Sequence, residues 1–398
     1  MNVPKLRFKE FNDKYNITKV SEIIDVIDGD RGNNYPKAND FYDSEFCLFL
    51  NAGNVTKNGF NFKNNQFITK EKDKKLRKGK LLINDVVLTT RGTVGNVTWF
   101  NEKTPYKNIR INSGMVINRI KENGHLLPEY LYSYMKSPVF ENQVNKMNYG
   151  SAQPQLTVSG INKFNIQYPT INEQKKVSTI MLLLDKKIEL QSKKIEDLKL
   201  FKLYLQNKLY NANDTKDVLI KDLGEIVTGT TPSKSENKYW DNGNILWITP
   251  TDICENRDIN DCSCKLTESG LAKGRFIPKN SILVTCIASI GKNAIIKEDG
   301  SCNQQINAII PSKDYNYNYI YYMIENLSNY MKSIAGTSAT AIINKEQFGN
   351  INIKIHKREV QDKISKILNA FETKIIQEGF KYKKLQNLKK GLMQNMFV

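Results

Sequence analysis

Arginine, asparagine, glutamine, serine and lysine side chains gather near glycines in two stretches of the chain, and such side chains hydrogen-bond to phosphates and base edges. Arg91 stands directly before Gly92 in a loop that follows an apolar run, so its guanidinium could pair bidentately with guanine. For any single residue the alternative is a loop side chain that satisfies nearby backbone. The candidate residues for contacts to phosphates and base edges are Arg91, Arg110, Asn112, Ser113, Ser233, Lys234, Asn303, Gln304 and Gln305.

No residue pattern matches a known catalytic constellation. The chain has no G-x-G-x-x-G at a strand end, no G-x-x-x-x-G-K-[ST], no H-E-x-x-H and no Asn-Pro-Pro-aromatic sequence. Nuclease chemistry would need clustered metal-binding carboxylates. Cys254, Cys262 and Cys264 lack a C-x-x-C pair and lie far from both histidines, which favours small hydrophobic side chains over zinc ligands. We therefore predict no catalytic residue, no metal and no cofactor in this chain.

Positive charge is concentrated in two stretches. The chain has 59 Lys and Arg against 41 Asp and Glu, a net charge of +18, and residues 171–210 and 357–398 carry more than half of this excess. A net charge of this size makes a polyanion a natural partner, with nucleic acid first and acidic membranes second. The lysines could follow a phosphate backbone, dock acidic partners, or simply solvate a helix face.

The chain is expected to be soluble and cytoplasmic. Its first ten residues contain no apolar segment of the kind found in secretory signals. No apolar run approaches the roughly 18–20 residues that a membrane helix requires.

A shift of 187 positions superimposes two long segments that read as helices. Gln174-Lys175-Lys176-Val177 aligns with Gln361-Asp362-Lys363-Ile364 without a gap, and apolar residues continue in both segments at alternating steps of four and three. This spacing is a heptad seam, which predicts a coiled coil. Polar residues interrupt both seams at equivalent places. If the helices pack antiparallel with positions that add up to 580, Gln191 faces Lys389 and Lys202 faces Glu378.

The segments between the helices also repeat. The apolar run and glycine loop at 84–95 resemble those at 280–291, where Ile287 replaces Arg91, and the tyrosine-rich stretch 130–135 resembles 319–324. Tyrosines at helical spacing favour packing over base stacking. Short β-rich runs mixed with helical stretches predict an α+β fold with a pseudo-twofold internal repeat. We expect boundaries at 1–168, 169–212, 213–356 and 357–398, in the order globular domain, helix, globular domain, helix.

The chain resembles the specificity subunits of type I restriction–modification systems over nearly its whole length. The resemblance is carried by Thr228-Gly229-Thr230-Thr231-Pro232-Ser233-Lys234, by Ile248-Thr249-Pro250-Thr251-Asp252-Ile253 and by Asn303-Gln304-Gln305, together with the two helix starts. The first half departs from it, because Asp28-Gly29-Asp30-Arg31-Gly32 stands where the second half has its Thr-Pro motif.

This resemblance implies a non-catalytic subunit. It implies two α/β target recognition domains, one for each half of a bipartite, asymmetric site on double-stranded DNA, separated by two long helices packed as an antiparallel coiled coil. The implied partners are two methyltransferase subunits that carry S-adenosylmethionine and two restriction subunits that use ATP and Mg. The alternatives are a stand-alone nuclease or methyltransferase with unrecognised motifs, and a scaffold whose basic helices bind acidic protein.

Overall fold

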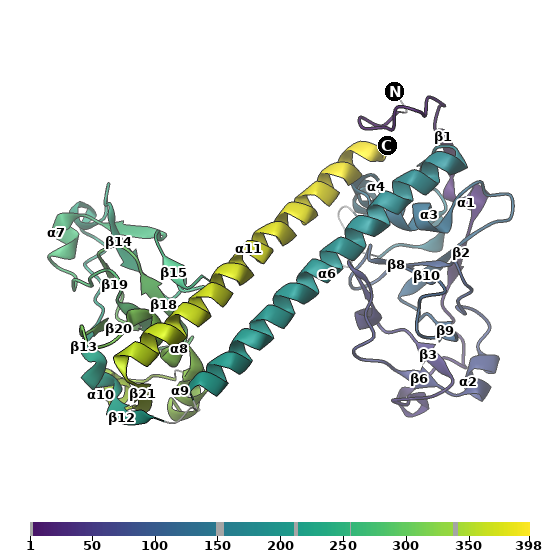
Figure 1. The fold of residues 1–398 in the computed structure, drawn as a ribbon. Helices are drawn as coiled ribbons and strands as arrows, with labels where there is room; N and C mark the ends of the chain where they lie inside the picture. The colour runs from purple at the N-terminus through teal and green to yellow at the C-terminus, as the bar shows by residue number, and fades with distance from the viewer. Residues whose placement is uncertain (1–2, 149–154, 211–213, 255, 337–340) are drawn as a thin grey trace. The chain divides into compact units, whose positions relative to one another are not determined.

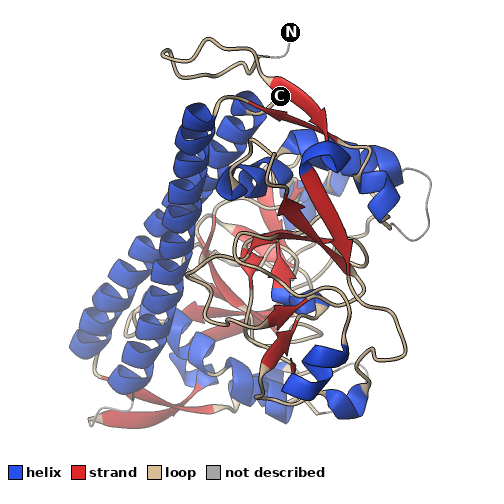
Figure 2. Ribbon diagram, turned by 90° about the vertical axis from the view of Figure 1, so that its right-hand side faces the viewer, coloured by secondary structure: helices blue, strands red, loops and turns tan. Residues whose placement is uncertain are grey.

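A computed structural model describes residues 3–148, 155–210, 214–254, 256–336 and 341–398. The chain divides into two compact units, each of which we describe by itself. Unit 1 comprises Met1–Ser192 and Phe380–Val398, and unit 2 comprises Lys193–Gly379. Helices and strands are mixed in both units (Figure 2), which confirms the α+β class.

Unit 1 is built on a four-stranded antiparallel sheet in the order β2-β10-β7-β8, of which β2, β10 and β8 are labelled in Figure 1. Because successive strand residues point to opposite faces, Val86 and Leu88 of β7 join the core that contains Tyr130, whereas Val87 joins a second core with Leu48. The strands are β1 (Asn16–Lys19), β2 (Ile24–Asp28), β3 (Cys47–Phe49), β4 (Val55–Thr56), β5 (Gly59–Phe60), β6 (Phe67–Ile68), β7 (Val86–Thr89), β8 (Val97–Trp99), β9 (Ile109–Arg110), β10 (Met115–Ile120) and β11 (Asn165–Tyr168). The short helices are α1 (Val20–Ile23), α2 (Lys70–Lys75), α3 (Pro128–Met135), α4 (Pro138–Asn148) and α5 (Val158–Ile161).

Unit 2 repeats this plan with a sheet in the order β13-β20-β17-β18-β15. Ile282 and Val284 of β17 join the core that contains Tyr319, whereas Leu283 joins the opposite core. The strands are β12 (Thr215–Leu219), β13 (Gly224–Thr228), β14 (Ile245–Ile248), β15 (Asp258–Ile259), β16 (Cys264–Leu266), β17 (Ile282–Thr285), β18 (Asn293–Ile296), β19 (Gly300–Cys302), β20 (Ile306–Pro311) and β21 (Asn352–His356). The short helices are α7 (Glu268–Leu271), α8 (Tyr317–Asn326), α9 (Ser328–Ile334) and α10 (Lys345–Gly349).

Backbone conformation confirms the internal repeat. Asn84 and Asn280, at equivalent places before β7 and β17, both adopt positive φ, at 78° and 66°. The loops after these strands have Gly95 at 93° and Gly291 at 82°. The tyrosines of α3 are buried, and so are Tyr319, Tyr321 and Tyr322 of α8, so these side chains pack in the cores, as their helical spacing predicted, and are not exposed for base stacking.

Two long helices belong to both units. Helix α6 (Ile171–Tyr210) and helix α11 (Arg358–Met396) keep all the predicted seam residues buried or half-buried. In unit 2 the helices run antiparallel, because Lys194 contacts Glu378 while Phe201, further along α6, contacts Phe371, earlier in α11. In unit 1 Val177 and Met181 of α6 share a core with the end of α11.

The predicted helix register is wrong by about one heptad. Lys202 pairs with Glu372 at 2.6 Å, where Glu378 was expected, and Lys389 pairs with Asp185, where Gln191 was expected. Each observed partner lies six residues before the expected one. A seam that repeats every seven residues keeps its apolar layers when it slips by one heptad, so the layers alone do not select a register. Side chains from the globular parts also contact these lysines and carboxylates, and the helix sequences do not contain that information.

Candidate nucleic-acid interface

Three loops of unit 1 meet at the ends of its central strands. They are residues 28–32 after β2, 90–95 after β7 and 111–114 before β10. Gly29 lies so close to the third loop that a Cβ built there would stand 2.3 Å from the carbonyl oxygen of Asn112, which explains the glycine. The amide of Thr90 donates to the carbonyl of Gly114 at 2.8 Å, and the Asn112 side chain accepts from the amide of Gly114 at 2.8 Å. The three loops, which we call the loop frame of unit 1, are therefore held together largely by backbone contacts.

Unit 2 contains the same frame in its loops 228–234, 286–291 and 302–305. A Cβ on Gly229 would stand 2.1 Å from the carbonyl oxygen of Asn303. The amide of Cys286 donates to the carbonyl of Gln305 at 2.9 Å, and the Asn303 side chain accepts from the amide of Gln305 at 3.0 Å. The two units thus share backbone contacts although the side chains on these loops differ.

In unit 1 the structure brings three of the four predicted residues together at this frame. Arg91 is exposed. Its Nη2 donates to the side-chain oxygen of Gln155 at 2.8 Å when the Gln155 amide is turned so that its oxygen faces the guanidinium. Ser113 is half-buried, and its carbonyl accepts from the Arg31 guanidinium at 3.2 Å. Asn112 is half-buried, and its side-chain oxygen accepts a hydrogen bond from the Gly114 amide within the same loop.

Arg110 does not belong to this surface, which corrects the sequence-based prediction. It is 5% exposed, and its Nε donates to Asp73 Oδ1 at 2.5 Å. Three further donors bond to the carbonyls of Lys78, Asp73 and Leu76 at 2.7–3.1 Å. An arginine has five N–H donors and this one directs them inward, so Arg110 holds the segment around α2 in place and is not available to bases.

In unit 2 all five predicted residues lie on the loops of the frame, in two groups. Ser233, Lys234 and Gln304 are exposed, and Thr231 Oγ1 donates to Gln304 Oε1 at 2.5 Å. Asn303 and Gln305 are more enclosed and bond to each other, with Asn303 Nδ2 donating to Gln305 Oε1 at 3.1 Å. The first group can reach a ligand directly, while the second group supports the loop.

Three arginines at these frames were not among the predicted contacts. Arg31 lies in the first loop of unit 1 and donates to Asp28 at 3.2 Å. Arg77 is 73% exposed, and the buried carboxylate of Asp30 bonds to both its amide and its guanidinium. Hydrogen bonds from the backbone amides of Arg77 and Gly32 lower the pKa of Asp30, so this carboxylate stays charged. Arg275 donates to the carbonyl of Thr228 in unit 2 at 3.1 Å. The sequence Asp28–Gly32, which stands where the second half has its Thr-Pro motif, could have indicated Arg31 and Arg77.

The described residues offer no metal-binding cluster of three or more His, Cys, Asp or Glu side chains. Within the described part of the chain, no helix is both long and apolar enough to cross a membrane. What the frames present is a set of exposed guanidinium, ammonium, amide and hydroxyl groups on a rigid backbone, which suits contacts to phosphates and base edges.

A family model for the type I restriction modification DNA specificity domain matches residues 12–200 and 213–387. The chain therefore belongs to this family. It is 32% identical over 185 residues to the Type I restriction enzyme MjaIX specificity subunit of Methanocaldococcus jannaschii, covering 45% of this chain and 43% of that protein. It is 32% identical over 212 residues to the EcoR124I/EcoR124II specificity subunit of Escherichia coli, covering 49% and 52%. These matches thus span about half the length of each relative.

Solved structures support the fold. The S subunit of the type I restriction–modification system from M. genitalium matches with a TM-score of 0.65 and 14% identity over 100% of this chain and 99% of that one. A chain from a study of complex assembly and conformational transition in a type I R-M system matches with a TM-score of 0.61 and 14% identity, covering 96% and 97%.

Proposed function

We propose that this chain is the DNA specificity subunit of a type I restriction–modification complex. It recognises a bipartite, asymmetric site on double-stranded DNA and positions methyltransferase and restriction subunits. The observation that carries the proposal is the pair of loop frames with matching backbone and different exposed side chains, because two similar frames with different side chains suit two half-sites of different sequence. The family match favours this function over a stand-alone nuclease or methyltransferase.

Recognition combines anchoring and base readout. Helix and domain lysines anchor phosphates, while exposed loop residues contact base edges. Arg91 and Arg77 are the foremost contacts in the first domain, and Ser233, Lys234 and Gln304 in the second. The unequal use of arginine means that the two half-sites differ in the bases they contain, since arginine pairs preferentially with guanine.

The long helices also suit partner docking. In unit 1 Leu183, Leu190 and Phe380 project apolar side chains into solvent. In unit 2 Leu200, Leu203, Tyr204, Ile367 and Ile376 do so. Exposed apolar residues beside lysines are typical of protein interfaces.

The complete assembly follows from this role. Two methyltransferase subunits would bring S-adenosylmethionine and two restriction subunits would bring ATP and Mg, so this chain needs no cofactor of its own and works in the cytoplasm. The recognition domains would span 1–168 and 213–356, joined by spacer helices at 169–212 and 357–398.

The proposal is tested by co-expression of this chain with its methyltransferase, followed by mapping of methylated adenines across a genome. We expect one asymmetric bipartite motif with a fixed unread spacer. A continuous palindrome, or methylation or cleavage by the purified chain alone, would overturn the proposal.

Replacement of Arg91 by alanine is expected to relax one base position in the first half-site only. Loss of a bidentate contact to guanine removes about 1–3 kcal/mol of discrimination. The measurement is binding of the complex to duplexes in which each half-site base is changed in turn. Ile287→Ala at the equivalent place in unit 2 should leave the first half-site unchanged. If Arg91→Ala weakens all duplexes equally and reduces the salt dependence, Arg91 is a phosphate contact instead.

A further inference from the structure

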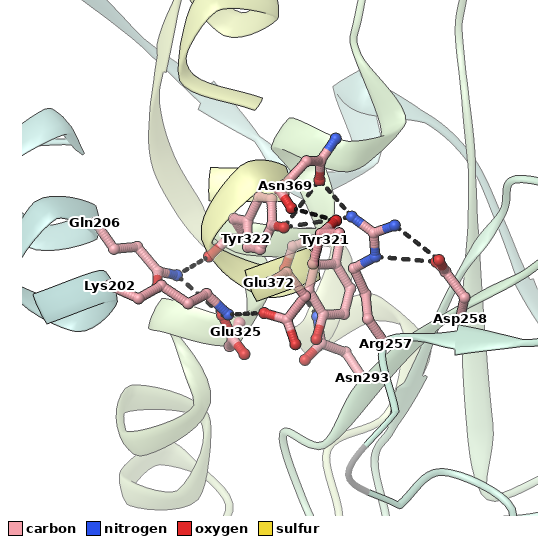
Figure 3. A network of polar contacts seen from close by, with 11 residues as sticks. Lys202, Gln206, Arg257, Asp258, Asn293, Tyr321, Tyr322, Glu325, Asn369 and Glu372 are labelled. Atoms are coloured by element: carbon pink, nitrogen blue, oxygen red, sulfur yellow. Dashed lines mark hydrogen bonds and ion pairs between the residues drawn. The ribbon is translucent and has the colours of Figure 1, made fainter. Parts of the chain in front are cut away.

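A partly buried polar network joins the second recognition domain to both long helices within unit 2. Figure 3 shows its residues converging from four directions: α6, α8, α11 and the strand region of β15. At its centre Lys202 of α6 is 8% exposed. Its ammonium bonds to Glu372 of α11 at 2.6 Å and to Glu325 of α8 at 3.2 Å, and lies 4.9 Å from the ring centre of Tyr322. One lysine thus ties together three helices.

The network extends along both long helices. Gln206, one turn after Lys202, donates to the carbonyl of Tyr322 at 2.8 Å and to Glu325 at 3.2 Å. On the α11 side, Asn369 accepts from the Tyr322 hydroxyl at 2.9 Å and also from the guanidinium of Arg257 (Figure 3). Tyr322 therefore bonds to both long helices.

Arg257 connects the network to the β-sheet of the domain. Its guanidinium donates to Asp258 of β15 at 2.7 and 3.0 Å and to the Tyr322 hydroxyl at 3.3 Å. Asn293 of β18 donates to the carbonyl of Tyr321 at 2.8 Å, which holds helix α8 on the same sheet. A continuous set of hydrogen bonds therefore runs from the spacer helices into the sheet that carries the recognition loops.

Unit 1 has an equivalent joint with the charges rearranged. Asp185 of α6 bonds to Lys389 of α11 and, at 3.3 Å, to Lys136, which follows α3. Lys136 also donates to the Tyr132 hydroxyl at 3.0 Å. Here one carboxylate stands between two ammonium groups, whereas in unit 2 one ammonium stands between two carboxylates. Each unit therefore contains a triad of charged side chains. In each triad one residue comes from α6, one from α11, and one from the domain, at helix α8 or directly after helix α3.

The geometry of these triads matters because apolar packing is not directional, whereas charged hydrogen bonds are. The apolar contacts between domain and helices would tolerate small rotations. A change of one base pair in DNA spacing demands a movement of about 3.4 Å and a rotation of about 34–36°. A joint held by partly buried ion pairs breaks its contacts long before such a movement is complete.

We propose that the Lys202 network is a positioning device that makes the complex strict about the spacing between half-sites. Lys202, Glu325 and Glu372 touch no DNA in this role; they act through the domain whose orientation they hold. The proposal rests on the proposed function, since it presupposes a bipartite site, and it adds the residues that enforce the spacer length.

The experiment maps methylated adenines in cells that co-express the methyltransferase with wild-type or variant chain. Lys202→Met keeps much of the length of the side chain and removes the charge. We expect it to retain both half-site sequences and to add sites whose spacer is one base pair longer or shorter. Lys202→Arg should restore the single spacing. Glu196→Gln, which removes a charge from an exposed residue of the same helix, is the matched control and should leave the motif unchanged.

Glu325→Gln is a milder second variant for the case in which Lys202→Met does not fold, because it keeps the shape of the side chain and should add fewer off-spacing sites. If both variants show only the native spacing, at normal or uniformly reduced methylation, the proposal that the Lys202 network enforces the spacing is overturned. If the wild-type chain itself yields no bipartite motif, the proposed function fails instead, so the two failures are distinguishable.

Discussion

Arg110→Ala is expected to lower the free energy of unfolding of unit 1 by about 3–5 kcal/mol, because it removes one of the two cations that pair with the buried carboxylate of Asp73. Lys80 still pairs with Asp73 at 2.5 Å, but three backbone carbonyls lose their donor as well. The measurement is hydrogen exchange in increasing urea, with amides of β9 and β10 reporting on unit 1 and amides of β17 and β20 serving as an internal control in unit 2.

Lys78→Ala is the matched control for this prediction. Lys78 is exposed in the same segment, and replacement of such a surface side chain usually changes stability by less than about 0.5 kcal/mol. If Arg110→Ala is as stable as the wild type but loses a base preference in the first half-site, Arg110 contacts DNA after all, and its buried position does not describe the DNA-bound protein.

Arg7→Ala is expected to destabilise the same unit by about 3 kcal/mol or more. Its guanidinium bonds to both oxygens of Glu173, at 2.9 and 2.7 Å, and this carboxylate is almost fully buried at the start of α6. Among the described residues, removal of the arginine leaves Glu173 with the Tyr15 hydroxyl, which donates at 3.2 Å, and a buried charge without a cationic partner is costly.

The loss should also reach the end of the chain. The amide of Leu6, next to Arg7, donates to the carbonyl of Asn395 at 2.9 Å, so this segment holds the last turn of α11. Hydrogen exchange in residues 390–398 should therefore become faster in Arg7→Ala than in Lys9→Ala, an exposed neighbour. Equal exchange in the two variants would show that the apolar core alone fixes the end of the helix.

Patterns that repeat along the chain were sufficient to predict the architecture. The heptad seam predicted both long helices, and the echo between 84–95 and 280–291 predicted two related domains with equivalent loops. The frame itself could be anticipated only in part. Glycine at 29 and 229 hints at close backbone approach, but which loops approach one another depends on strand order, and strand order is not readable from local spacing.

Arg110 and the helix register could not be predicted, for a shared physical reason. An arginine at a strand end looks the same in sequence whether it faces solvent or Asp73, 37 residues earlier. A heptad seam looks the same after a slip of seven residues, and the side chains that complete the observed joints, Lys136 and Glu325, come from elsewhere in the chain. In both cases a long-range partner decides, and the local pattern does not contain it.

The division of the chain into units has a consequence for biosynthesis. Unit 2 is one continuous stretch, 193–379, whereas unit 1 needs residues 380–398, and Met393, Met396 and Phe397 lie in its core. Proteins usually fold from the N-terminus onward as they leave the ribosome. Here the order is partly reversed. Unit 2, which is translated later, can complete its core first. Unit 1 keeps an apolar surface exposed until the end of α11 emerges.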